Sequence, residues 1–538
     1  MARRLLTLAT VGVAHCYSAS LPAPNCSLKS LALPATQHEG IEIVTTEVQS
    51  VTNYTFFDLT VANATAADFF DFCNVTVTYT HPGWNDTINL ITYLPADWNG
   101  RFLALGGAGM AAGGEALLHL TPGTITSQLK RKFVISTTDG GHPSDLYAAS
   151  DVDPPWVFTS PGNIDLPMLV NFASRSLHDM AVLGKSLVRA GYGIAPEYSY
   201  FFGGSTGGLQ GHMLAQRYPE DFDGIVANKP GINWTKFFFS DVFAKLIMDV
   251  AGKYPWPCEL DALSAAAVEA CDELDGVKDG IISRPGLCTF DPRTLAGSAF
   301  DCNGVPATFS SISTEVAYAA YTGPRGPNGE FRWYGFSKDV SLHANGTGPA
   351  RLECPAIGGG NCSALSFHMS DLWFRYFYAK DPSFNLISLT RERFDDLFLI
   401  AVNEYESVVG AADPDLSRFR RAGGKMLAWH GMVDQLVPVN GSTDYYDRVL
   451  AKDPKAQDYY RLFLAPGADH TGAGITVSDE ECLDYIVNWV EHGRVKETLR
   501  AAGATGMGVL AQRDICMYPR VQHYKAGDPS LPSSFICI

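Results

Sequence analysis

Short apolar runs alternate with longer amphipathic segments along this chain, and the two patterns predict different elements. The short runs, which have the length of buried strands, lie at 101–105, 132–136, 198–202, 224–227, 425–429 and 460–464. Segments with helical periodicity lie at 174–190, 206–217, 442–450 and 479–491. Strands that alternate with helices are typical of a mostly parallel, doubly wound sheet. The pattern therefore predicts an α/β fold.

Two segments depart from this alternation. Residues 40–100 alternate apolar and polar positions between turn signals, which predicts antiparallel strands at one edge of the sheet. Residues 233–394 lose the alternation and hold six cysteines, much glycine and proline, and aromatic clusters such as that around Trp373 and Phe374. A segment this long and apolar is not a loop. We expect an inserted lid domain over the carboxyl edge of the sheet, between two catalytic parts at 21–232 and 395–538. Its aromatic clusters either line a pocket or form core.

The N-terminus and the cysteine content indicate a secreted protein. Residues 1–20 combine two arginines, an apolar run at 5–14 and small residues at 18–20, as in a cleaved signal peptide. Twelve cysteines suit an oxidising compartment, and removal of Cys16 leaves an odd number. Cys482, within the predicted helix 479–491, is the candidate for a free buried thiol. Nine glycosylation sequons begin at Asn25, Asn53, Asn63, Asn74, Asn85, Asn233, Asn345, Asn361 and Asn440.

Charge and hydropathy limit the partners. The net charge of −17 argues against binding to nucleic acid or to anionic membrane surfaces. After the signal peptide, the sequence has no apolar stretch long enough for a membrane span. We therefore expect a soluble, secreted glycoprotein whose partner is a small molecule or a polymer-linked substrate.

One stretch carries the pattern of a nucleophile. Ser205 lies in Gly-x-Ser-x-Gly, between the predicted strand 198–202 and the predicted helix 206–217. This strand–turn–helix context is that of a nucleophile elbow, where the turn is too tight for side chains beside the serine. The helix N-terminus also stabilises negative charge. The alternative is an ordinary surface serine, which the context disfavours.

A serine nucleophile needs a base and an acid on neighbouring strand ends. Asp434 follows the predicted strand 425–429, and His470 follows the strand 460–464. These residues have the chain order of α/β-hydrolases. Asp469 is an alternative acid, although a residue adjacent in sequence rarely orients the ring. His492 at a helix end and His523 in a polar tail are weaker candidates for the base.

The glycine-rich turn after the strand 101–105 is the candidate for half of an oxyanion hole. One N–H group would come from Thr206, directly after the serine, and another from Gly107, Ala108 or Gly109. The alternative is a plain glycine-rich strand end. A dinucleotide-binding loop is disfavoured, because no helical pattern and no downstream ribose-binding acid follow it.

A second cluster of polar residues lies in the inserted segment. Asp272, Asp275 and Asp279 lie a few residues apart around a glycine turn, and the carbonyls of Val277 and Ile281 would complete an oxygen cage. Many oxygen ligands in a tight loop suit calcium, although the spacing is not that of an EF-hand. The alternative is a solvated acidic turn. We expect a structural calcium ion.

Taken together, these motifs resemble the tannase and feruloyl esterase family over nearly the whole mature chain. The resemblance is carried by Arg175–His178, Gly203–Gly208, Ala215–Pro219, Phe222–Ile225, Asn233–Trp234, Cys271–Gly280 and Trp489–Gly493. It implies a secreted α/β-hydrolase with a large calcium-bearing lid that cleaves esters of gallic, ferulic and related aromatic acids. It places Ser205, Asp434 and His470 on the catalytic triad, and the acidic loop on the calcium site.

The cysteines both support the resemblance and depart from it. The pairs suggested are Cys26–Cys73, Cys258–Cys302, Cys271–Cys288, Cys354–Cys362 and Cys516–Cys537. Family members usually carry a further disulfide between the residue before the nucleophile and the residue after the histidine, where this chain has Gly204 and Thr471. Its loss is expected to loosen the histidine unless packing compensates.

Two other functions stay open: a lipase or peptidase on the same fold, and a non-catalytic binding protein.

Overall fold

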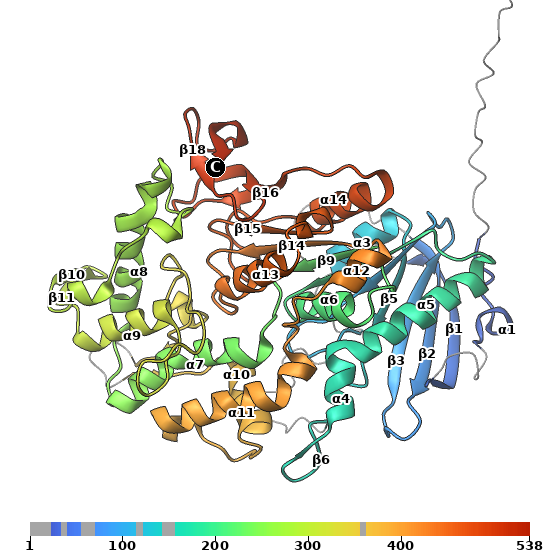
Figure 1. Cartoon of the computed structure of the whole chain (residues 1–538), viewed down its shortest axis with the longest axis horizontal. Coiled ribbons are helices and arrows are strands. Elements are labelled where there is room, and N and C mark those ends of the chain that lie inside the picture. The colour runs from blue at the N-terminus through green and yellow to red at the C-terminus, as the bar shows by residue number, and fades with distance from the viewer. Residues whose placement is uncertain (1–22, 34–39, 55–69, 115–121, 143–155, 356–361) are drawn as a thin grey trace, which may run out of the picture.

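The computed structural model describes residues 23–33, 40–54, 70–114, 122–142, 156–355 and 362–538 (Figure 1). The expected signal peptide, Cys16 and the sequons at Asn63 and Asn361 lie outside these residues. In the described part of the chain, no helix combines the length and the apolar character that a membrane span requires.

A nine-stranded sheet forms the centre of the described structure, in the spatial order β1-β2-β3-β5-β4-β8-β9-β14-β15. Strands β1, β2, β3 and β5 pair antiparallel, and the remaining pairs are parallel. The bounds are β1 Glu42–Tyr54, β2 Phe70–Thr80, β3 Ile88–Pro95, β4 Arg101–Leu105, β5 Val134–Thr138, β8 Tyr198–Gly204, β9 Gly224–Asn228, β14 Lys425–Gly431 and β15 Tyr460–Ala465. The predicted α/β sheet with one antiparallel edge is confirmed, although β5 begins two residues after the predicted strand.

Helices cover both faces of this sheet. Alternate residues of β4 divide between two hydrophobic cores: Phe102 packs on one face with α5, α6 and α13, and Leu103 on the other with α3 and α14. The bounds are α1 Leu28–Leu31, α3 Pro122–Lys130, α4 Leu166–Val170, α5 Ser176–Tyr192, α6 Thr206–Arg217, α12 Ser417–Ala422, α13 Asn440–Lys452 and α14 Asp479–His492. A π-helical turn over Asn171–Arg175 joins α4 to α5, so the helix predicted at 174–190 begins inside that turn.

Most of the segment predicted as an insertion, residues 233–394, lies in a helical lobe to one side of the sheet (Figure 1), and the predicted boundary at 394 falls inside a helix of that lobe, α11, which continues to Val409. Its main elements are α7 Trp234–Ala251, α8 Pro257–Cys271, α9 Ser311–Thr322, α10 His368–Leu372, the π-helical turn Trp373–Tyr378 and α11 Arg391–Val409, with the short hairpins β10 Ala299–Cys302 with β11 Val305–Thr308 and β12 Leu352–Glu353 with β13 Ser363–Ala364. Leu260 of α8, Val316 of α9 and their neighbours form a separate hydrophobic core.

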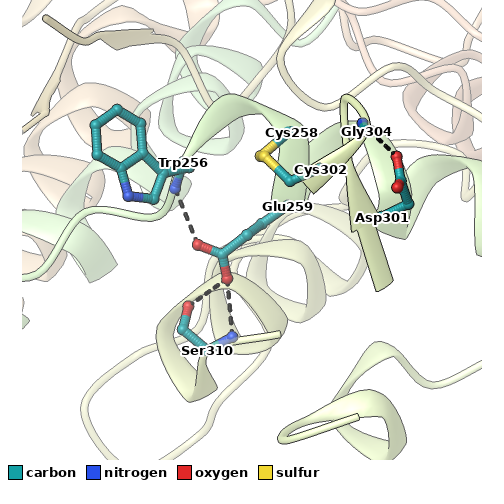
Figure 2. Close-up of a disulfide and its surroundings, with 7 residues drawn as sticks. All are labelled: Trp256, Cys258, Glu259, Asp301, Cys302, Gly304 and Ser310. Atoms are coloured by element: carbon teal, nitrogen blue, oxygen red, sulfur yellow. Dashed lines mark hydrogen bonds between the residues drawn. A yellow bond between two sulfur atoms is a disulfide. The ribbon is translucent and has the colours of Figure 1, made fainter. Parts of the chain in front are cut away.

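The start of α8 is fixed by polar contacts as well as by a disulfide (Figure 2). Glu259 accepts hydrogen bonds from the N–H of Trp256 at 3.0 Å and from the N–H and hydroxyl of Ser310 at 2.8 and 2.6 Å. The Cys258–Cys302 disulfide lies beside these contacts and ties α8 to β10. Together they hold the ends of α8, α9 and the hairpin against one another.

The C-terminal residues form two hairpins, β16 Thr498–Ala504 with β17 Leu510–Cys516 and β18 Gln522–Tyr524 with β19 Phe535–Cys537. The expectation that His523 lies in a polar tail is therefore wrong, since it belongs to β18. Apolar and polar residues alternate only weakly along the sequence of these short strands, and contacts with residues distant in sequence stabilise them. One such contact is the Cys516–Cys537 disulfide.

The cysteine pairing of the structure is the one that the resemblance suggests. The disulfides are Cys26–Cys73, Cys258–Cys302, Cys271–Cys288, Cys354–Cys362 and Cys516–Cys537. Among the described cysteines only Cys482 is free, and its side chain is fully buried in α14. Burial raises the pKa of this thiol well above its ordinary value, so it stays protonated.

Candidate active site

Ser205 occupies a strained turn between β8 and α6. Its φ of 58° and ψ of −116° lie outside the regions that side chains favour. A Cβ at Gly203 would come within 2.5 Å of the Gly207 carbonyl oxygen, and one at Gly207 within 2.9 Å of the Gly107 oxygen. The two glycines are therefore required by the close approach of backbone around the serine, as the sequence pattern predicts.

The structure brings Ser205, His470 and Asp434 together from three strand ends. His470 Nε2 lies 3.0 Å from Ser205 Oγ, and His470 Nδ1 lies 2.7 Å from Asp434 Oδ2. Because an ionised carboxylate only accepts, Nδ1 donates to Asp434 and Nε2 is left to accept the serine proton. Burial alone would raise the pKa of Asp434, but attraction to the His470 ring in its protonated form and hydrogen bonds from His430 and His470 hold this pKa well below its usual range. Asp434 is therefore ionised.

A further histidine, which the sequence analysis did not single out, also contacts Asp434. His430 Nε2 lies 3.0 Å from Asp434 Oδ2 and 3.2 Å from the Val437 carbonyl oxygen, both of which accept. Nε2 therefore carries a proton, and Nδ1 lies 2.8 Å from the Ser442 hydroxyl oxygen, within hydrogen-bond distance. The N–H groups of Leu436 and Val437 donate to the other carboxylate oxygen at 2.9 and 2.7 Å. In the sequence, the only sign of this contact is that His430 lies four residues before Asp434, directly after a predicted strand.

The alternative acid and bases lie elsewhere. Asp469 accepts hydrogen bonds from the Thr471 hydroxyl at 2.9 Å and the Ala473 N–H at 2.8 Å, so its carboxylate closes its own loop. His492 ends α14, followed by Gly493 in the left-handed conformation. His523 lies in β18. Of the residues weighed from the sequence, His470 is the base that contacts the serine, and Asp434 is the acid that contacts His470.

Two N–H groups of the glycine-rich turn are already engaged. The Gly107 N–H donates to Gln210 Oε1 at 2.7 Å, and the Ala108 N–H donates to the Ala111 carbonyl at 3.2 Å. These contacts disagree with the expectation that any residue of the turn could supply an oxyanion donor. The Gly107 N–H is occupied by the side chain of Gln210, which reaches the turn from α6 and is 103 residues distant in sequence.

Gly109 and Thr206 are the candidate oxyanion residues whose N–H groups are not engaged in the described structure. The Thr206 hydroxyl donates to the Gly109 carbonyl at 2.7 Å, which ties the turn to the start of α6. In the described structure neither the Gly109 N–H nor the Thr206 N–H has a hydrogen-bond acceptor. Thr206 begins α6, and the first N–H groups of a helix lack partners within the helix, so the N–H of Thr206 is available to a ligand.

The acidic loop after α8 is folded around one of its own carboxylates. Asp272 accepts from three successive backbone N–H groups, those of Asp279, Gly280 and Ile281, at 3.2, 2.8 and 3.4 Å. A carboxylate has about four acceptor sites, so these bonds occupy most of Asp272. The Asp272 side chain therefore supports the turn directly, a role that the sequence analysis did not predict.

Asp275 and Asp279 are the carboxylates with oxygens to spare. Asp275 Oδ2 and Asp279 Oδ1 are buried and have no hydrogen-bond partner. Arg513 of β17 lies 2.9 Å from the other oxygen of Asp279. Buried carboxylate oxygens without partners are costly, and a cation between them would remove that cost. No three described His, Cys, Asp or Glu side chains converge on a metal site by themselves, so the carbonyls of Val277 and Ile281 would have to contribute.

The aromatic pair Trp373 and Phe374 belongs to the core. Both side chains are fully buried, and Trp373 stacks on Phe377 with ring centroids 4.0 Å apart. Of the two expectations for this cluster, packing rather than pocket lining describes these two residues.

Comparison with known proteins places the chain in a family. A sequence model described as tannase and feruloyl esterase matches residues 73–538. The chain is 36% identical over 476 residues, 87% of this chain and 86% of the relative, to a probable feruloyl esterase of Arthroderma benhamiae. It is 30% identical over 527 residues, 89% of this chain and 87% of the relative, to a mono(2-hydroxyethyl) terephthalate hydrolase of Piscinibacter sakaiensis.

A solved structure has the same fold. The tannin acyl hydrolase from Aspergillus niger superimposes with a TM-score of 0.81 over 96% of both chains, at 24% identity. The sheet order, the position of the serine turn and the family match agree on an α/β-hydrolase. This chain is thus a member of the tannase and feruloyl esterase family.

Proposed function

We propose that this protein is a secreted serine esterase that cleaves esters of aromatic acids through a Ser205–His470–Asp434 triad. The observation that carries the proposal is the hydrogen-bonded chain from Ser205 Oγ through both nitrogens of His470 to an ionised, buried Asp434. The substrate class rests on the family and on the names of its relatives, a probable feruloyl esterase and a hydrolase of a terephthalate monoester.

The geometry leads to a two-step reaction. Ser205 Oγ attacks the ester carbonyl while His470 Nε2 takes its proton, and Asp434 stabilises the imidazolium that forms. The N–H groups of Thr206 and Gly109 would hold the oxyanion. The tetrahedral intermediate collapses, the C–O bond to the alcohol breaks, and His470 returns the proton to the leaving alcohol. Water then attacks the acyl-enzyme with the same histidine as base, which releases the acid and restores the serine.

The proposal includes a calcium ion with a structural role. Asp275 and Asp279 would be the principal ligands through their unpartnered oxygens, with the carbonyls of Val277 and Ile281, while Asp272 holds the loop. A bound cation would neutralise the buried carboxylates. Because Arg513 joins Asp279 to β17, the ion would stabilise the junction between the lobe and the C-terminal hairpins.

Secretion rests on the leader-like N-terminus, the five disulfides and the relatives from fungi and bacteria. Of the sequons on described residues, Asn85 is exposed, whereas Asn233 is fully buried and its N–H donates to Gly410. We expect glycans at exposed sequons alone.

The test is hydrolysis of a panel by wild type and Ser205→Ala. The panel contains methyl ferulate, methyl gallate, mono(2-hydroxyethyl) terephthalate, a short aliphatic nitrophenyl ester and a peptide. We expect wild type to cleave an aromatic acid ester and the variant to lose at least about 10³-fold in kcat. Full activity of the variant would rule out the triad mechanism. Cleavage of the peptide or the aliphatic ester alone would favour the alternative hydrolase classes.

A further inference from the structure

Side chains from two neighbouring loops hold the backbone of His470, one at its carbonyl group and the other at its N–H group. The Lys229 ammonium donates to the His470 carbonyl at 2.9 Å, and the His470 N–H donates to Gln435 Oε1 at 3.0 Å. Lys229 directly follows β9, and Gln435 lies in the loop after β14. The peptide groups on either side of the histidine are therefore tied to two other strand ends.

Lys229 is itself fixed along its length. Its backbone has a φ of 44°, in the left-handed region, and its N–H donates to the Trp429 carbonyl at 2.7 Å. The ammonium lies 5.6 Å from the centroid of the Trp429 ring, within range of a cation–π interaction. A non-glycine residue in this conformation is strained, and the surrounding contacts must hold it there.

This lysine ties the His470 loop to the end of β9, the strand beside β8, whereas a cross-link between Gly204 and Thr471 would tie that loop to the end of β8. Asn228, which precedes Lys229, pairs with Gly204 in the sheet, and Thr471 follows His470. A Cβ at Gly204 would meet its first neighbour, the Asn228 oxygen, at 3.6 Å, which is ordinary contact. Unlike Gly203 and Gly207, Gly204 is thus a position where a side chain fits.

We infer that Lys229 is a positioning residue, a non-covalent tether that holds His470 at hydrogen-bond distance from Ser205. The inference rests on the proposed function, since it concerns the geometry of that catalytic pair. A charged donor on a carbonyl makes a stronger hydrogen bond than a neutral one. The tether acts on the backbone of the histidine, so its loss would displace the ring while leaving the substrate-binding surface in place.

The experiment compares Lys229→Met with a matched control, Lys425→Met. Lys425, at the opposite end of β14, makes the same two kinds of contact with other partners. Its ammonium lies 5.6 Å from the Trp489 ring centroid and donates to the Asp458 carbonyl at 3.1 Å. We expect K229M to lower kcat about 10- to 100-fold with KM little changed, because small displacements of a catalytic group cost about this much. K425M is expected to keep the wild-type kcat.

Hydrogen exchange and a rescue variant separate positioning from general stability. Deuterium uptake in residues 466–474 is expected to rise in K229M and not in K425M, with similar melting temperatures. Adding Gly204→Cys and Thr471→Cys to K229M is expected to restore kcat once the new disulfide is verified by mass spectrometry, whereas Gly204→Cys alone is not.

Three outcomes would overturn the inference: wild-type kcat in K229M, an equal loss in K425M, or a verified disulfide without recovery. If K229M does not fold, Lys229→Gln takes its place in the same comparison. Ser205→Ala keeps the two proposals apart. An inactive S205A together with a fully active K229M would remove the tether alone, and an active S205A would remove the triad itself.

Discussion

His81 lies outside the active site, in a buried ionic network whose strength can be measured through pH. The residue follows β2 directly and is 3% exposed, with Nδ1 at 2.6 Å from Asp86 Oδ2 and Nε2 at 2.8 Å from Asp179 Oδ2. Arg175 lies 3.0 Å from the other oxygen of Asp179. The network joins the antiparallel edge of the sheet to α5.

The magnitude follows from the pKa. Burial by itself would lower the pKa of His81, but hydrogen bonds to Asp179 and Asp86 and their negative charges raise it to about 9. Against an unfolded value of about 6.5, a difference of about 2.5 units corresponds to about 3 kcal/mol. Because the folded pKa is the higher one, this stabilisation is complete below pH 6.5, declines between pH 6.5 and 9, and is lost above pH 9.

The perturbation is His81→Gln, which removes the charge and keeps much of the volume. An unfolding entropy of about 2.1 cal/mol/K per residue over about 500 residues makes 3 kcal/mol equal to about 3 °C in Tm. We expect H81Q to melt about 3 °C below wild type at pH 5.5 and close to wild type at pH 9.5. His178→Gln is the control, because His178 pairs with Asp221 at 2.7 Å in a partly exposed position and should contribute less. A difference between H81Q and wild type that does not change with pH would refute the reasoning.

Three further predictions follow from the described contacts. His430→Asn is expected to lower kcat about tenfold with little change in KM, because Asp434 loses a hydrogen bond to a charged group worth about 1.5–3 kcal/mol; a wild-type rate would show that the remaining contacts suffice. Removal of calcium with EGTA is expected to lower Tm and its return to restore it, whereas Asp279→Asn should abolish that response, and a Tm insensitive to EGTA in wild type would contradict the site. Glycopeptide mass spectrometry of secreted protein is expected to find a glycan at Asn85 and none at Asn233, and occupancy of Asn233 would conflict with its burial.

The nucleophile turn was predictable because its determinants are local. Gly203, Ser205 and Gly207 lie within five residues, and the apolar strand before them and the helix after them are read from the same short window. The strands of the parallel sheet were predicted for the same reason. The start of β5 differed from the prediction because Lys132 adopts a left-handed φ of 67°, so the chain is still in a turn where the predicted strand begins.

The choice among candidate groups required the folded chain. In the sequence, Asp434 and Asp469 are both aspartates that could act as the acid. The folded loops distinguish them, because Asp434 contacts His470 whereas Asp469 accepts a hydrogen bond within its own turn. The engagement of Gly107 by Gln210 depends on a contact between residues 103 positions apart, and local sequence patterns do not encode such a pair.

The sequence by itself determined the alternation of strands and helices, the strained serine turn and the types of residue at the strand ends, because these depend on short-range sterics and periodic burial. The tertiary structure decided which of those residues meet: His430 behind Asp434, Lys229 on the His470 loop, and Arg513 on the acidic loop. The physical reason is that a hydrogen bond forms only when donor and acceptor lie about 3 Å apart, and only the packing of distant segments brings these groups to that distance.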